Sequence, residues 1–292
     1  MRAVPYPSRV TLHRLDNVPR LEAPVLIVAF DGWVDAGGAA TTAANRIAEG
    51  GEVIATFDPD ALFDYRARRP SLEIVDGRPT ELTWPELTVR HAHVGNRDVL
   101  VIAGPEPDYR WHEMSDSMVE LATTLGVVEW ISLGAIPGAV PHTRPVHVMG
   151  TASSPELLRG GVEPGPEGIL RVPAAALSVI EMAVAAAGIP AVGYFAHVPH
   201  YVTGPSPAAA IELLRVLGRH LGTEISLGAL PEEAREVQAR LDLAIAADDA
   251  TRAHIARLEA RVDEQSQPNG DDLIADIERF LRDRGNEGSQ RS

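Results

Sequence analysis

The 292-residue sequence contains no cysteine and no lysine. The absence of cysteine excludes disulfides, thiolate zinc sites, iron–sulfur ligation and cysteine nucleophiles. The absence of lysine removes the phosphate-binding lysine of P-loop enzymes and the Schiff-base lysine of pyridoxal enzymes. All 26 basic side chains are arginine, which supplies a positive charge but no amine nucleophile. We therefore expect no bound cofactor.

Long apolar runs are also lacking. No stretch reaches the roughly 20 residues that a membrane-spanning helix needs, and the longest candidate, Ala174 to Ala187, carries Glu181 and is typical of a buried helix. Prolines at positions 5 and 7 stand where a signal peptide has its apolar segment. The sequence therefore predicts a cytoplasmic protein that does not enter a membrane.

Positive charge is scarce relative to negative charge. The formal net charge is -15, with 41 acidic residues against 26 basic ones. Nucleic-acid binding depends on clustered basic side chains that neutralise phosphates, so no nucleic-acid partner is expected. The hydrophobic content of 45% and the charged content of 23% are typical of a folded globular chain with a substantial core.

Continuous apolar strands alternate with helical segments along most of the chain. The stretch from Val25 to Phe30 is apolar throughout, as in a strand that is buried on both faces. With the helix and strand that follow, it predicts a βαβ unit. Strands are predicted at 25–30, 52–57, 99–102, 130–133, 145–149 and 191–194, and helices at 36–48, 112–125, 174–187 and 207–221. This alternation predicts an α/β three-layer sandwich with a mostly parallel sheet.

Three segments depart from that alternation. The lead-in before Pro24 has short apolar pieces between prolines, typical of an extended segment or an edge strand. Residues 71–94 alternate apolar and polar around a turn at Asp76-Gly77, which predicts an antiparallel insertion or an edge of the sheet. From Thr223 onward the chain has 16 acidic residues and 9 arginines, and apolar residues recur at helical spacing. We predict an α/β domain over 1–222, an acidic helical region over 223–284 that ends in a short helix near 273–281, and a disordered tail over 285–292.

Polar residues gather in loops that follow strands, where open α/β sheets place ligand sites. The first loop holds Asp31, Trp33 and Asp35, and Asp35 also suits the N-cap of the next helix. The second loop, Gly104 to Glu113, mixes carboxylates, arginine and aromatics, which are typical of interface hot spots. The alternative for this loop is a turn in which Trp111 only packs.

Histidines occur in two further loops, 141–145 and 197–201. Their spacing differs from the H-E-x-x-H of zinc peptidases, so no metal ligand is predicted. Gly150 to Ser154 lacks the G-x-S-x-G pattern of a hydrolase nucleophile. The residues predicted to bind a partner are Asp31, Trp33, Asp35, Glu106, Arg110, Trp111, His142, Arg144, His200 and Tyr201.

Taken in order, five motifs resemble the proteasome assembly chaperone 2 family, particularly its actinobacterial branch. They are Asp31 to Gly37, Gly104 to Pro107, Pro141 to Pro145, Gly150 to Ser153, and Pro199 to Tyr201 with Pro205 and Pro207. The resemblance covers about Pro24 to Val262. It implies a phosphorylase/hydrolase-like α/β fold, homotrimers and a role in proteasome assembly. The absence of lysine argues against the ATP-grasp enzymes beside which this group has been placed.

Two functions follow as hypotheses. The first is a homo-oligomeric, protein-binding assembly chaperone whose partners are itself and proteasome subunits or another protein. The chain ends at Gly288 to Ser292, without the hydrophobic-Tyr-X ending of archaeal relatives that dock on proteasome rings. The alternative is an enzyme on a phosphorylase-like scaffold that acts on a small nucleoside-like or amide substrate, with Asp31, Glu106 and His200 as acid/base groups.

Overall fold

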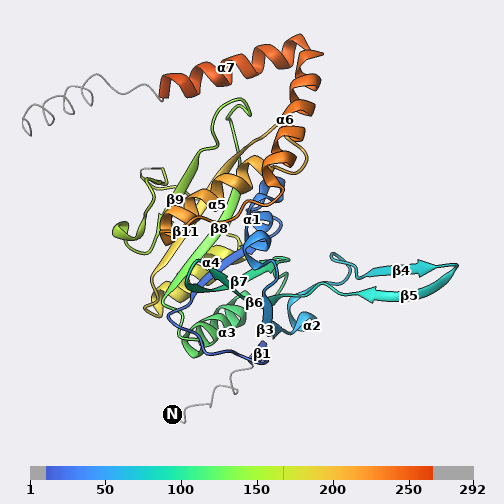
Figure 1. Ribbon diagram of the computed structural model, residues 1–292, viewed down its shortest axis with the longest axis vertical. Helices are drawn as coiled ribbons and strands as arrows, with labels where there is room; N and C mark the ends of the chain where they lie inside the picture. The colour runs from blue at the N-terminus through green and yellow to red at the C-terminus, as the bar shows by residue number, and fades with distance from the viewer. Residues whose placement is uncertain (1–10, 167, 266–292) are drawn as a thin grey trace, which may run out of the picture.

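The computed structural model describes residues 11–166 and 168–265 and is built around a nine-stranded sheet (Figure 1). The strand order is β1-β3-β6-β7-β2-β8-β11-β9-β10. These strands are β1 (His13–Leu15), β2 (Val25–Phe30), β3 (Glu52–Phe57), β6 (Thr88–Val94), β7 (Arg97–Gly104), β8 (Glu129–Gly138), β9 (Val148–Ala152), β10 (Glu163–Pro164) and β11 (Ala191–Pro199).

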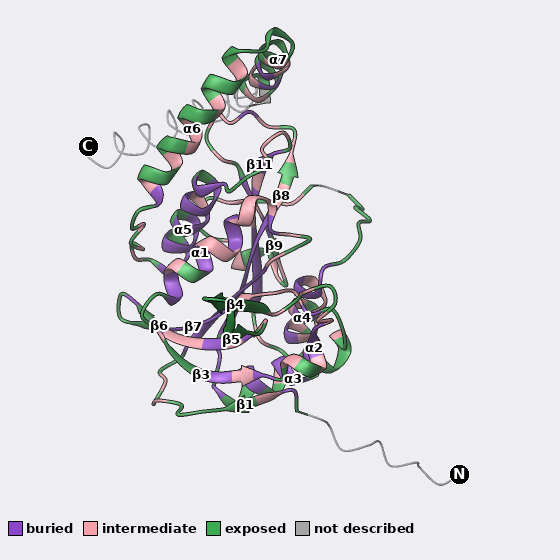
Figure 2. Cartoon of the chain, turned by 90° about the vertical axis from the view of Figure 1, so that its right-hand side faces the viewer, coloured by how far each residue is buried: buried purple, intermediate pink, exposed green. Residues whose placement is uncertain are grey.

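Helices cover both faces of the sheet, so the predicted three-layer α/β sandwich is confirmed. Side chains of β2 alternate between two cores: Val25 and Ile27 face one, and Leu26 and Val28 face the other. The first core lies under α1 (Ala39–Ala48) and α5 (Pro207–Leu221), and the second under α3 (Trp111–Thr124) and α4 (Ala176–Ala186). Figure 2 shows the buried strands between these helices. This double burial explains the uninterrupted apolar run of β2.

The sheet is parallel in its centre and partly antiparallel on both sides. Strands β7, β2, β8 and β11 run parallel, whereas β6 is antiparallel to β7, and β9 is antiparallel to β11. The two strands of the predicted βαβ unit, β2 and β3, are not neighbours in the sheet, because β6 and β7 lie between them. The strand predicted at 145–149 runs from Val148 to Ala152 instead. Pro145 lacks the N–H that a paired strand donates.

The segment predicted as an antiparallel insertion or edge divides in two: its first part is a two-stranded arm that projects from the body (Figure 1), and its last part is β6, which lies inside the main sheet. Its strands, β4 (Ser71–Val75) and β5 (Arg78–Thr83), are exposed along their whole length. Asp76 and Gly77 form the tip with φ of +52° and +76°, the left-handed pair that a tight hairpin turn requires. Three short helices complete the described elements: η1 (Ala36–Gly38) leads into α1, α2 (Pro59–Leu62) precedes the arm, and η2 (Pro155–Leu157) precedes β10.

Two acidic helices follow the α/β body. Helix α6 (Leu230–Ala246) packs on α5, and α7 (Asp249–Gln265) packs on α6. The short helix predicted near 273–281 and the tail predicted over 285–292 lie outside the described residues. Within the part of the chain that the structure describes, no helix combines the length and apolarity that crossing a membrane requires.

Candidate binding site at the base of the arm

The loop after β2 is tied to the segment that leads into the arm. Arg68 Nη1 donates to Asp31 Oδ2 at 3.0 Å, and its Nη2 lies 2.9 Å from Asp31 Oδ1. The Glu106 amide donates to Asp31 Oδ1 at 3.1 Å, and Arg68 Nε lies 3.9 Å from Asp108 Oδ1. We call these four residues the arm-base cluster. The fork of one arginine thereby joins the loops after β2 and β7 to the arm.

Two carboxylates predicted as site residues serve as helix caps. Glu106 Oε1 accepts a hydrogen bond from the Ala176 amide at 2.7 Å, at the start of α4, where Ala175 offers no side-chain cap. Asp35 accepts from the Ala40 amide at 2.7 Å and from the Thr41 hydroxyl. Burial raises the Asp35 pKa, and these hydrogen bonds partly offset the rise. Asp35 therefore satisfies amides of the first turn of α1, although Gly38 occupies the N-cap position of that helix.

Aromatic residues stand close in sequence to members of the arm-base cluster. Trp33 is 62% exposed and Tyr109 is 49% exposed. The Tyr65 and Trp84 rings meet edge to face at the foot of the arm, with centroids 4.7 Å apart. Burial and the Asp60 carboxylate, which accepts the Tyr65 hydroxyl proton in a hydrogen bond, raise the pKa of Tyr65 to about 12. Exposed aromatics beside a charged cluster match the composition of protein interfaces.

The loop before α3 is held by contacts of its own side chains. Trp111 Nε1 donates to the Pro107 carbonyl at 2.6 Å, and its ring packs partly buried against the second core. Arg110 adopts φ of +60° and pairs with Glu113 in the first turn of α3. Trp111 thus packs, as the alternative interpretation of this loop held, while Tyr109 faces solvent.

The four predicted residues from the histidine loops form a second group that faces the chain's own C-terminal helices. His142 Nε2 lies 3.1 Å from Asp242 Oδ1 of α6, and the His142 amide donates to the Tyr201 hydroxyl at 2.8 Å. Arg144 donates through Nε and Nη2 to the two oxygens of Asp263, both at 2.7 Å. We call His142, Arg144, His200 and Tyr201 the helix-anchor cluster.

Electrostatics in the helix-anchor cluster follow from these pairings. The Asp263 carboxylate raises the pKa of Arg144, and the Arg144 guanidinium lowers the pKa of Asp263. The His200 ring lies against that of His254 in α7, with centroids 5.6 Å apart. Two cavities adjoin the cluster. One of about 380 Å³ extends from His142 to Leu241, and one of about 620 Å³ has His197 in its wall.

The structure brings Asp31 and Glu106 together but places His200 elsewhere. Asp31 contacts Arg68 and the Glu106 amide. His200 Nδ1 lies 3.2 Å from the Gly138 carbonyl oxygen, and its ring contacts Tyr201 and His254. An acid/base mechanism needs its groups within reach of one substrate. This arrangement favours a binding surface over the three-residue catalytic site.

Some residues of both clusters have no recognisable signal in the sequence. Arg68 lies in a segment without strand or helix periodicity, and its partner Asp31 is 37 positions away. Asp242, Glu259 and Asp263 belong to helices whose charge resembles that of a solvated face. The net negative charge of these helices is the signal in the sequence that points to them as partners for Arg144.

These features define a three-layer α/β protein with exposed aromatic residues at the arm base, in which the loops after β8 and β11 contact the chain's own C-terminal helices. The chain matches the PAC2 family over residues 29–245 and belongs to that family. The family resemblance read from the sequence is thereby confirmed.

Solved structures agree with this assignment. A Corynebacterium glutamicum protein of unknown function is 30% identical, with a TM-score of 0.82 over 88% of this chain and 98% of its own. A Mycobacterium tuberculosis proteasome-assembly chaperone homologue is 35% identical, with a TM-score of 0.72 over 79% of this chain and 99% of its own. Pyrococcus furiosus PbaB, an archaeal proteasome activator, shares the fold at 16% identity, with a TM-score of 0.65 over 81% of this chain and 99% of its own. Among curated protein sequences there is no match.

Proposed function

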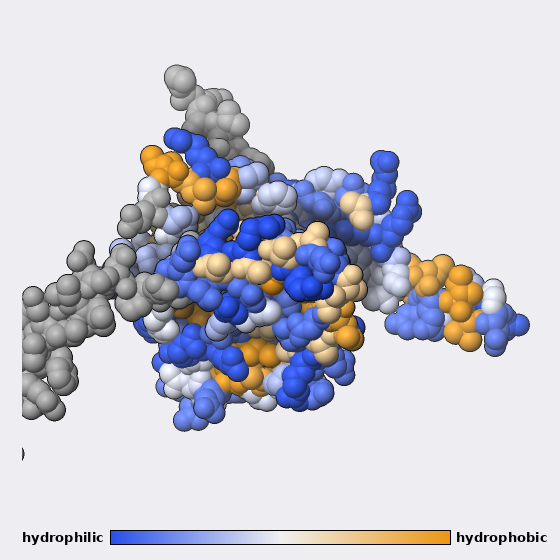
Figure 3. Space-filling view, turned by 90° about the horizontal axis from the view of Figure 1, so that it is seen from above, coloured by the Kyte–Doolittle hydropathy of each residue, from blue (hydrophilic) through white to orange (hydrophobic). Residues whose placement is uncertain are grey.

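We propose that this PAC2 protein is a self-associating, protein-binding assembly chaperone whose arm and arm base contact its partners. The arm is the observation that carries the proposal. Leu72 and Leu82 stand opposite each other in the hairpin and are 50% and 47% exposed, and Ile74 is 58% exposed. Figure 3 shows hydrophobic side chains along the projecting arm, at the right of the view.

Physical reasoning supports a partner for this arm. A two-stranded hairpin alone is marginally stable in water, and its apolar side chains gain free energy only when another surface covers them. Contiguous exposed apolar surface of this kind marks protein contact sites. Trp33 and Tyr109, which are close in sequence to residues of the arm-base cluster, are also large and exposed. Catalysis plays no part in the proposal.

The partners proposed are further copies of this chain, as a homotrimer, and proteasome subunits. Support comes from PAC2 membership and from the related M. tuberculosis protein that is named as a proteasome-assembly chaperone homologue. The cytoplasmic location expected from the sequence is part of the proposal. Subcellular fractionation of the host with an antibody against the chain tests it.

The experiment uses two variants of the full chain. The arm variant Leu72→Ser/Leu82→Ser removes the cross-strand apolar pair, and the control Leu243→Ser changes a side chain of α6 that is 75% exposed. Light scattering after gel filtration measures the mass, and co-elution with purified proteasome subunits measures binding. We expect the arm variant to lose both the trimer mass and the partner, while the control keeps both. An arm variant that behaves like the control refutes the proposal.

A further inference from the structure

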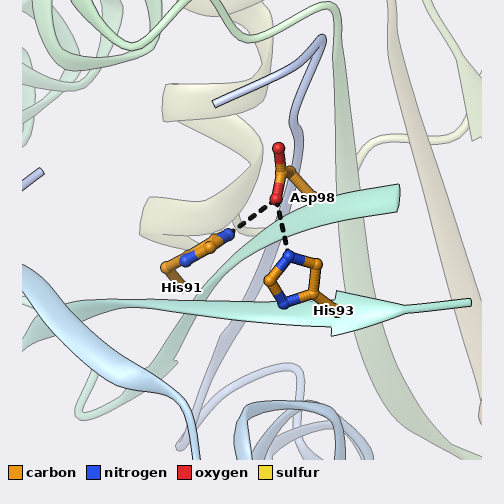
Figure 4. Close-up of side chains that lie close together, drawn as sticks. All are labelled: His91, His93 and Asp98. Carbon is orange, nitrogen blue, oxygen red and sulfur yellow. Dashed lines mark hydrogen bonds and ion pairs between the residues drawn. The ribbon is translucent and has the colours of Figure 1, made fainter. Parts of the chain in front are cut away.

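Two histidines and an aspartate converge at the turn end of the β6–β7 hairpin, outside both clusters described above (Figure 4). His91 and His93 are two positions apart on β6, so their side chains leave the same face of the strand. Asp98 on β7 stands directly opposite His93 in the register. The hairpin thereby brings three potential metal ligands to one side of two neighbouring strands.

The donor atoms already lie at the spacing of a metal site. His91 Nε2 is 2.8 Å and His93 Nε2 is 3.1 Å from the same oxygen, Asp98 Oδ1, and the three donors all lie within 4.8 Å of one another. Nitrogen and oxygen ligands at about 2.1 Å from Zn²⁺ are separated by about 3.3 Å in a tetrahedral site. Small rotations of the side chains are enough to centre an ion between them.

The surroundings hold this triad in place. The Glu22 amide donates to Asp98 Oδ2 at 2.7 Å, which fixes the carboxylate and directs its other oxygen towards the imidazoles. The side chains of His91 and Asp98 are only 11% and 12% exposed, whereas that of His93 is 64% exposed. Two of the potential ligands, His91 and Asp98, are therefore nearly buried, and the third, His93, lies on the solvent side. Hydrogen bonds to ligating carboxylates are typical of such sites.

We propose that His91, His93 and Asp98 form a binding site for a divalent transition metal, with Zn²⁺ as the ion. Two imidazoles and one carboxylate suit a borderline ion such as Zn²⁺ and are a poor match for Mg²⁺ or Ca²⁺, which prefer oxygen ligands. Three protein ligands leave one tetrahedral position for water or for an exchangeable ligand. The proposal departs from the expectation of no metal ligand, which rested on other histidines.

The test titrates the full, tag-free chain with Zn²⁺ in a calorimeter and with Co²⁺ while visible absorption is recorded. We expect one equivalent to bind with micromolar or tighter affinity, and excess Mg²⁺ to leave binding unchanged. His93→Ala removes the exposed ligand and should weaken Zn²⁺ binding at least tenfold with an unchanged circular dichroism spectrum. Asp98→Asn should weaken it to a similar extent.

A second histidine pair provides the matched control. His147 and His197 lie with their Nδ1 atoms 3.0 Å apart in another part of the sheet, and the double variant His147→Ala/His197→Ala should bind Zn²⁺ like the unmodified chain. Absence of saturable binding by the unmodified chain overturns the proposal. Unchanged affinity in His93→Ala, or loss of binding only in the control variant, overturns it equally.

Discussion

Replacing His220 by alanine should lower the free energy of unfolding by about 3 kcal/mol, because it leaves the buried Glu129 carboxylate without its nearest side-chain partner. His220 Nε2 lies 3.2 Å from Glu129 Oε2, and the two side chains are 0% and 11% exposed. On its other side, His220 Nδ1 lies 2.7 Å from the Tyr194 hydroxyl oxygen. Glu129 Oε1 has no hydrogen-bond partner within the described chain, so the carboxylate depends strongly on His220.

The magnitude follows from these contacts. Leaving a buried polar group without its partner costs about 1–3 kcal/mol, and more when that group is charged, as the Glu129 carboxylate is. Arg159 and Arg97 also stabilise the ionised Glu129, which keeps the expected loss near about 3 kcal/mol. The variant Tyr194→Phe loses one hydrogen bond and should cost only about 1 kcal/mol. Urea denaturation at neutral pH measures both losses, with m-values that stay constant if the unfolded states are alike.

The direction of the Glu129 pKa shift determines how the cost of His220→Ala changes with pH. Burial alone would raise the pKa of Glu129, but contact with His220 and the charges of His220, Arg159 and Arg97 outweigh burial and lower it. A lowered folded-state pKa contributes stability that is present above the unfolded pKa and is lost as pH falls through the folded pKa. The cost of His220→Ala should therefore shrink on acidification below about pH 4. A loss under about 1 kcal/mol, or one that is constant from pH 3 to 7, would refute the reasoning.

Three further predictions concern single positions. Asp35→Ala removes the cap of α1 and should cost about 1–2 kcal/mol in urea denaturation. Arg144→Ala should speed amide hydrogen exchange in α7, whereas Arg252→Ala, which removes an ion pair within α7, should not; equal exchange in both would contradict the anchoring role. Gly37→Ala should lower the melting temperature more than Gly38→Ala. Both residues have positive φ, but an added Cβ meets Ser206 Cβ at 2.7 Å only at Gly37; equal losses would contradict the packing argument.

Helices and strands were predictable where burial requires apolar residues to recur in a regular pattern along the sequence. Strand β2 and helix α5 have the predicted bounds, because an apolar run between Pro24 and Asp31 and a Pro at the first turn of α5 mark their ends. Strands β8 and β11 continue several residues past their predicted ends. The added residues include Gly138, His197 and Pro199. Glycine and proline rarely occur within strands, so residue type did not predict these extensions, but pairing between β8 and β11 continues through them.

The sites were predictable only in part, since side-chain type does not say which partner the fold supplies. Asp35 was placed as a cap by its position before a helix, a local relation. The His91, His93 and Asp98 triad has a local signal as well, an H-x-H on an alternating strand before a short turn. The strand after that turn was predicted to begin at residue 99, and it begins at Arg97. That shift left Asp98 off the strand and hid its cross-strand position.

The carboxyl edge of the parallel strands, the usual place for ligands in open α/β folds, carries ion pairs within this chain at two places. Arg68 closes the ends of β2 and β7, and Arg144 with α7 closes the side of β8 and β11. Residues of catalytic type at these positions therefore hold chain segments together. The large apolar side chains of the arm remain about half exposed. Because burial of such side chains is the main source of association free energy, the arm is where contact with another chain gains most.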